Sequence, residues 1–212
     1  MKLTLHTFLS IDGVMQGPGG FEEDRSGGFD RGGWLMPYGD EVMGEIVEGW
    51  FAKADAILLG RTTYTMMQSY WSQVDDGSNT ANGLNNLPKY VATSTPLEPA
   101  WNDSTALSGD VVKLVEELKA KPGGELQIHG SCGLARSLHQ AGQIDEYRLL
   151  TFPVAIGTGK RLFTDDAPAT GFKLVESRVT STGATYSALT PTPFLTGTAV
   201  VEDGSSTFSV NS

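Results

Sequence analysis

The order of hydrophobic patterns along the chain is the feature that most restricts its fold. Short apolar runs, which are typical of buried parallel strands, lie at KLTLHTFL (2–9), DAILLG, KYVATS and ELQIHG. Apolar residues at spacings of three and four predict helices between them, from Asp40 to Ala54, over 62–70, over 111–118 and at CGLARSLHQ. Strands that alternate with helices in this way predict an α/β fold with a mostly parallel central sheet flanked by helices.

After Gly142 the pattern changes to strands alone. The segments EYRLLTF, FKLVESRV and ATYSALT are strand-like, and TSTG between the last two predicts a C-terminal antiparallel hairpin at the edge of a mixed sheet. We expect one domain over 1–193, followed by a tail or an extra edge hairpin over 194–212. Ligands of such sheets bind beyond the carboxyl ends of the parallel strands.

Composition excludes several classes of function. The chain has 212 residues, enough for a large core, and a formal net charge of −10, which argues against nucleic acid or an anionic membrane surface as a partner. Cys132 is the only cysteine and excludes an internal disulfide. No apolar run has the roughly 20 residues of a membrane span, and the N-terminus lacks a signal-peptide core, so we expect a cytoplasmic protein. The three histidines, His6, His129 and His139, have no partners at ligand spacing, which predicts no metal site.

A glycine-rich stretch over 16–40 lacks helical or strand periodicity and is too long for an ordinary connection. Its length and composition indicate a lid or binding loop. The alternative is a flexible insertion without a function.

The strand DAILLG ends at Gly60 and leads directly into a helix. Glycine allows a sharp turn there, and the free N–H groups of the helix start form an anion site in the crevice. Thr62 or Thr63 can cap this helix and also donate a hydroxyl to a phosphate, while Arg61 adds a permanent positive charge. The alternative is an ordinary strand-to-helix turn with a capping threonine.

Two more strand ends repeat this arrangement. In IHGSCGLARSL, Gly130, Ser131 and Gly133 lie at the start of a helix, and two helix starts able to bind phosphates indicate a dinucleotide. In VATSTPL, Ser94 and Thr95 supply hydroxyls suited to a ribose or its 2′-phosphate rather than a carboxylate that would select NADH. The GxGxxG fingerprint of Rossmann folds is missing from the sequence.

These motifs, with FLSIDGVM at the first strand and LTFPVAIGTGKRLF near residue 160, resemble the dihydrofolate-reductase-like superfamily. The closer resemblance is to the bacterial branch related to the reductase domain of the riboflavin-biosynthesis deaminase-reductase, and it covers about residues 2–190. It implies an eight-stranded mixed sheet, NADPH bound across the strand ends, and hydride transfer to a pterin- or pyrimidine-like heterocycle or a related small molecule. We also expect a homodimer.

The resemblance also implies roles for individual residues. The cofactor's phosphates would be held by Gly60, Arg61, Thr62 and Thr63. Its adenosine ribose would contact Ser94 and Thr95, and its pyrophosphate would be held by Gly130, Ser131 and Cys132. Gly133, at the same helix start, is also expected to bind the cofactor.

Candidates for the substrate side lie at other strand ends. Asp12 and Asp40 are the carboxylates expected to aid proton transfer or orient the substrate, and Trp34, Gly157 and Gly159 are expected beside it. A helix cap explains Asp40 equally well, and a turn explains Asp12 followed by glycine. The zinc motif of a deaminase domain is missing from the sequence. The sequence therefore predicts an NADPH-dependent reductase, and the alternative is a non-catalytic nucleotide-binding or ligand-sensing module.

Overall fold

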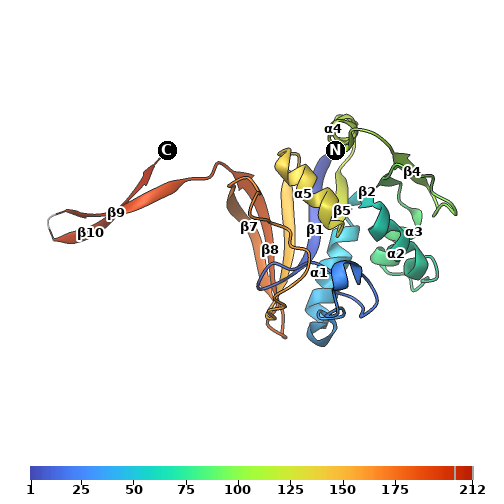
Figure 1. The fold of residues 1–212 in the computed structure, drawn as a ribbon, viewed down its shortest axis with the longest axis horizontal. Helices are drawn as coiled ribbons and strands as arrows, with labels where there is room; N and C mark the ends of the chain where they lie inside the picture. The colour runs from blue at the N-terminus through green and yellow to red at the C-terminus, as the bar shows by residue number, and fades with distance from the viewer. Residues whose placement is uncertain (203, 212) are drawn as a thin grey trace.

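The computed structural model describes residues 1–202 and 204–211, and its centre is one large sheet (Figure 1). Its strands are β1 (Lys2–Ser10), β2 (Ala54–Gly60), β3 (Lys89–Ala92), β4 (Ser104–Leu107), β5 (Glu125–His129), β6 (Glu146–Phe152), β7 (Gly171–Val179) and β8 (Thr185–Thr192). Their order is β4-β3-β2-β5-β1-β6-β8-β7, and the first six are parallel while β8 and β7 are antiparallel. The predicted mixed, mostly parallel sheet of about eight strands with an antiparallel hairpin is confirmed.

Helices cover both faces of this sheet (Figure 1). They are α1 (Glu41–Phe51), α2 (Arg61–Trp71), α3 (Asn79–Asn86), α4 (Val111–Lys119) and α5 (Cys132–Gln140), with short 3-10 turns at Ser26–Gly28 and Met36–Tyr38. Helices α4 and α5 pack with one apolar cluster, and α1 packs with the cluster on the opposite face. The predicted helix after Asp40 is shorter than expected, because α1 ends at Phe51 and Ala54 begins β2.

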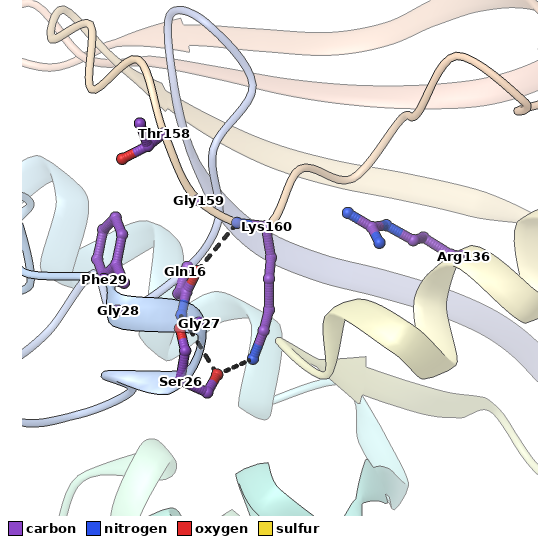
Figure 2. A pocket seen from close by; sticks show the side chains of 9 residues that line it. All are labelled: Gln16, Ser26, Gly27, Gly28, Phe29, Arg136, Thr158, Gly159 and Lys160. Carbon is purple, nitrogen blue, oxygen red and sulfur yellow. Dashed lines mark hydrogen bonds between the residues drawn. The ribbon is translucent and has the colours of Figure 1, made fainter.

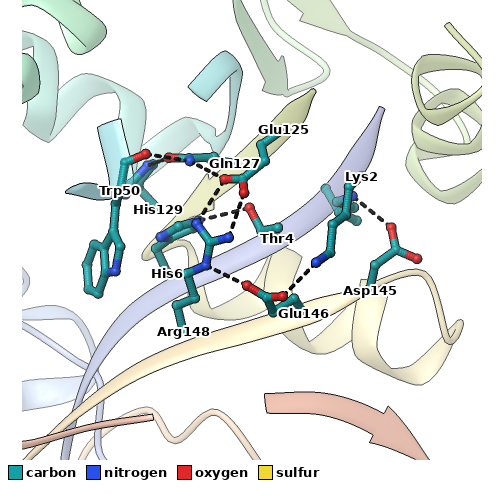
Figure 3. A network of polar contacts seen from close by, with 11 residues as sticks. Lys2, Thr4, His6, Trp50, Glu125, Gln127, His129, Asp145, Glu146 and Arg148 are labelled. Carbon is teal, nitrogen blue, oxygen red and sulfur yellow. Dashed lines mark hydrogen bonds and ion pairs between the residues drawn. The ribbon is translucent and has the colours of Figure 1, made fainter. Parts of the chain in front are cut away.

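A buried ionic network holds the central strands in register (Figure 3). Arg148 of β6 reaches across β1 to Glu125 of β5, with a shortest N–O distance of 2.6 Å, and it also pairs with Glu146 at 2.6 Å. Lys2 of β1 pairs with the same Glu146. Charged groups this deep in a protein need partners on every side, and three strands supply them here. The network fixes the strands whose carboxyl ends form the crevice.

The last described residues form a separate hairpin of β9 (Thr196–Glu202) and β10 (Ser205–Asn211). This hairpin extends away from the body of the protein on the side of β7 and β8 (Figure 1). This hairpin does not pair with the eight-stranded sheet, so it is not the extra edge hairpin expected from the sequence as one alternative.

Among the described residues, no helix is long and apolar enough to cross a membrane.

Candidate functional site

The first two predicted helix starts meet at the carboxyl edge of the sheet, because β2 and β5 are neighbouring strands. Gly60 donates its backbone N–H to Oγ of Ser131 over 2.9 Å. A Cβ atom at Gly60 would lie 3.6 Å from the Ser131 side chain, and one at Gly130 would lie 3.6 Å from Thr63. The starts of α2 and α5 therefore form one junction, which we call the helix-start junction and define as residues 60–63 and 130–133.

The backbone of the junction leaves N–H groups available to a ligand. Gly130 and Ser131 are both left-handed, each with a φ of 59°, a conformation that is uncommon for serine. Gly60 and Ser131 occupy the N-cap positions, and neither α2 nor α5 has a side-chain cap. The expected capping by Thr62 or Thr63 is therefore wrong. The first N–H groups of a helix have no partner within it, and two such starts side by side suit an anion.

The third strand end lies beside this junction. Arg61 donates from Nη1 to the carbonyl oxygen of Pro96 over 2.7 Å, so its guanidinium lies against the loop that follows β3. Ser94 and Thr95 are exposed in that loop, and Oγ1 of Thr93 accepts the N–H of Thr95. The structure thus brings together all three strand ends chosen from the sequence.

Cys132 and Gly133 begin α5, and the structure gives them different surroundings. The Cys132 thiol is directed to the carbonyl oxygen of Arg161, 3.2 Å away, and burial raises its pKa. Only the backbone of Cys132 is therefore suited to a phosphate. A Cβ atom at Gly133 would meet no atom within 4 Å, so the space beside this residue is open.

Asp12 lies at the end of β1, but its carboxylate is occupied by the protein. It accepts hydrogen bonds from the Ser10 hydroxyl at 2.6 Å and from the backbone N–H groups of Ile156 and Gly157 at 3.0 and 2.7 Å. Arg161 pairs with it at 3.3 Å. These hydrogen bonds, led by that of Ser10, hold the pKa of Asp12 far below its usual value. The carboxylate is ionised at neutral pH and joins two loops, so it does not fit the expected role of proton donor.

Asp40 is the N-cap of α1, as the capping interpretation predicts. One carboxylate oxygen accepts the Met43 N–H at 2.8 Å, and the other accepts the Ser181 hydroxyl at 2.7 Å. The hydrogen bond from Ser181 is the main cause of a lowered pKa for Asp40. This carboxylate therefore caps a helix and fastens it to the turn between β7 and β8, and it is not poised to donate a proton.

The glycine-rich segment 16–40, which we call the lid, is anchored to the body at several points. The ring of Trp34 is buried against Phe152 of β6, and within the lid its indole N–H donates to the carbonyl oxygen of Gln16 at 2.8 Å. Lys160 pairs with Asp24 at 2.6 Å. A loose insertion would lack such contacts, so the structure favours a packed lid. Trp34 is buried in the core, and its expected place beside a substrate stays a prediction.

A cavity of about 470 Å³ lies between the lid, the turn at 158–160 and α5 (Figure 2). Residues 26–29 of the lid form one wall, and Gly159 and Arg136 line the others. Arg136 uses Nε to bind the carbonyl oxygen of Arg161 at 2.7 Å, and that is the one hydrogen bond of its guanidinium within the described chain. The expected position of Gly159 beside a ligand is consistent with this cavity. Gly157 is exposed outside it and is held by Asp12.

Two histidines that looked scattered in the sequence lie together under the crevice. His6 and His129 stack on neighbouring strands with ring centroids 4.9 Å apart, and Phe51 stacks on the other face of His129 (Figure 3 shows both histidines). Burial lowers the pKa of His6, and it lowers that of His129 to about 3. Both rings are neutral packing groups at physiological pH. In the part of the chain that the structure describes, no three His, Cys, Asp or Glu side chains lie close enough together to hold a metal ion.

This chain is similar to known proteins over most of its length. Residues 1–186 match the family model described as the RibD C-terminal domain. The uncharacterized protein YyaP of Bacillus subtilis (strain 168) is 30% identical over 186 residues, which is 86% of this chain and 90% of that protein.

Solved structures agree in fold. A protein of Shewanella sp. PV-4 named for riboflavin biosynthesis superposes with a TM-score of 0.68 at 22% identity, covering 91% of this chain and 100% of that one. Dihydrofolate reductase from Enterococcus faecalis, complexed with NADP(H) and RAB-propyl, gives a TM-score of 0.59 at 14% identity, covering 91% and 97%. The chain therefore belongs to the RibD C-terminal domain family and has the dihydrofolate-reductase-like fold.

Proposed function

We propose that this protein is an NADPH-dependent reductase that acts on a pterin- or pyrimidine-like heterocycle or a related small molecule. The helix-start junction is the observation that carries the proposal. Two uncapped helix starts lie in contact through Gly60 and Ser131, and an arginine lies against the neighbouring loop. This arrangement matches a ligand with two linked phosphates and a further phosphate on a ribose.

The residues present fit such a cofactor. The left-handed turn at Gly130 and Ser131 directs the start of α5 toward that of α2, and Thr62 is exposed beside it. The N–H groups of the junction would bind the pyrophosphate, and Arg61 with Ser94 or Thr95 would bind the 2′-phosphate. When bound, NADPH supplies the hydride.

The cavity under the lid is the proposed substrate side. Helix α5 begins at the junction and contributes Arg136 to the cavity, so a single helix connects the two regions. The lid, fastened by Lys160 and Asp24, would exclude water from the reacting atoms. Asp12 would position the turn that contains Gly157 and Gly159. Because neither carboxylate is poised as a donor, a single water admitted at the edge of the cavity would supply the proton.

A nucleotide-binding module without turnover is the second candidate. One observation favours it: both carboxylates expected to serve as acids are occupied by structural hydrogen bonds and have lowered pKa values. Such a module would bind the cofactor at the same junction and would not oxidise it.

Titration with NADPH followed by a turnover assay distinguishes these candidates. We expect saturable quenching of the protein's tryptophan fluorescence by NADPH, and oxidation of bound NADPH when dihydropterins or ribosylated pyrimidines are added. Saturable binding with no oxidation across such a panel would support the module. The absence of saturable binding at millimolar NADPH and NADH would overturn both.

A further inference from the structure

The C-terminal hairpin of β9 and β10 has one apolar face and one polar face. Its register places Phe208 opposite Ala199 and Val210 opposite Gly197, and Val201 lies on the same side because alternate residues of a strand share a face. The other face carries mainly hydroxyl side chains, among them Thr198, Thr207 and Ser209. Alternation of this kind is typical of strands that are covered on one side.

Nothing in the described chain covers that apolar face. Phe208 is 86% exposed, Val201 is 78% exposed and Val210 is 68% exposed. Among the hairpin residues whose side chains the structure describes, none belongs to the three apolar clusters of the body. A two-stranded hairpin alone is marginally stable in water, so this one needs a further surface to pack against.

The body presents an uncovered apolar surface near the root of the hairpin. Strand β7 is the last strand of the eight-stranded sheet and pairs with β8 alone, so one backbone edge is open. Its exposed apolar side chains are Leu174, Val175 and Val179, and Val179 is 69% exposed. The chain leaves the body beside this strand, because a Cβ atom at Gly171, the first residue of β7, would lie 2.5 Å from the carbonyl oxygen of Pro193.

We propose that the hairpin packs on β7 of a second copy of this chain, and that two copies exchange hairpins in a symmetric dimer. Both surfaces needed for this contact occur in one chain. The strands β9 and β10, of seven residues each, are short enough to lie along the nine residues of β7. The hairpin points away from its own β7 (Figure 1), so it cannot cover that strand in this conformation. A twofold exchange buries both apolar surfaces in each copy and closes the assembly at two.

The hairpin lies outside residues 1–186, the segment that matches the family model. It is therefore an addition to the family fold, and the contact proposed for it does not depend on the cofactor site or on the proposed function.

Sedimentation velocity on the full chain over a range of concentrations tests the proposal. We expect the wild-type chain to be a dimer of twice 22.6 kDa at micromolar concentration. Phe208→Ser, which removes the largest apolar side chain of the hairpin, and Val179→Lys, which places a charge on the exposed face of β7, should each raise the dimer dissociation constant at least tenfold.

Thr207→Ser, on the polar face of the hairpin, is the matched control and should leave the dissociation constant unchanged. Hydrogen exchange gives a second readout that does not depend on Phe208. The hairpin amides should be protected in the wild type and should lose that protection in Val179→Lys, although residue 179 lies in the body. A monomeric wild-type chain would overturn the proposal, and this is also the result expected if the hairpin binds a different protein. Protection of the hairpin amides that persists in Val179→Lys would overturn it as well.

Discussion

The helix-start junction and the two carboxylates lie at the same edge of the sheet, yet they differ in how much of their bonding capacity the protein itself uses. At the junction, α2 and α5 begin without side-chain caps. At Asp12 and Asp40, each carboxylate accepts at least three hydrogen bonds from the chain. Unused donors are available to a ligand, and saturated acceptors are not. The junction is therefore the better candidate for binding, and the carboxylates hold loops in place.

Removing the arginine of the junction should have the largest effect. Arg61→Ala should weaken NADPH binding by about 1.5–3 kcal/mol, the range for hydrogen bonds to charged groups, and should change NADH binding much less. The reason is that Arg61 lies against the loop of Ser94 and Thr95, where the 2′-phosphate would bind. Dissociation constants for both cofactors, measured by fluorescence, check this.

Arg178→Ala is the control for that measurement, because Arg178 pairs with Glu45 on another part of the surface and should affect neither cofactor. An equal loss for NADPH and NADH in Arg61→Ala would place the guanidinium at the pyrophosphate. No loss for either would make Arg61 a surface charge.

Asp12→Ala should reduce stability more than cofactor binding. The substitution leaves the N–H groups of Ile156 and Gly157 without their acceptor. We expect the free energy of unfolding to fall by about 2 kcal/mol, a figure reduced because water reaches part of the site. Urea unfolding measures it, and NADPH titration of the same variant should give a nearly unchanged dissociation constant. A stable variant with lost cofactor affinity would contradict the structural role.

The contribution of Asp12 should also depend on pH. Its pKa is lower in the folded chain than in the unfolded chain, so the unfolded state takes up protons first as the pH falls. The stabilisation is complete above the unfolded pKa of about 4 and is lost progressively below it. The difference in unfolding free energy between the wild type and Asp12→Asn should therefore shrink from pH 6 toward pH 2. A constant difference over that range would show that the charge of Asp12 is not responsible.

Substitution of Asp40 should have the smallest effect, because asparagine can take its place as the N-cap of α1. Asparagine is as good an N-cap as aspartate, so Asp40→Asn should leave the melting temperature almost unchanged, whereas Asp40→Ala should lower it by about 2–4 °C. Both variants should retain turnover within a few-fold of the wild type once a substrate is known. A loss of about 100-fold in Asp40→Asn with normal cofactor binding would instead restore Asp40 as an acid–base group.

The sequence predicts the sheet and most helices because their apolar periodicity is local. It misses α3, whose residues NTANGLNN include poor helix formers. Contacts from distant residues compensate, since Glu48 accepts the N–H groups of Asn79 and Thr80 and Leu84 is buried. It also misses the short strand β4, which lies at the edge of the sheet.

In the candidate site, too, some residues can be predicted from a local pattern and others depend on distant contacts. The glycines and hydroxyls of the junction follow directly from strand ends, and the structure places them together. The functions of Asp12 and Trp34 depend on partners far along the chain or across the core, namely Gly157 and Phe152. No local pattern shows such pairs, and no motif singled out Arg136, which becomes notable only because the lid encloses a cavity next to it.

Backbone amide shifts during titration with NADPH show which residues bind the cofactor. If the junction binds the cofactor, the largest saturable shifts should fall on residues 60–63 and 130–133, with smaller ones at 94–95. The amides that Asp12 and Asp40 hold, those of Gly157 and Met43, should retain their hydrogen-bonded positions. Saturable shifts centred on residues 157 and 43, with none at the junction, would show that the cofactor does not bind at the junction.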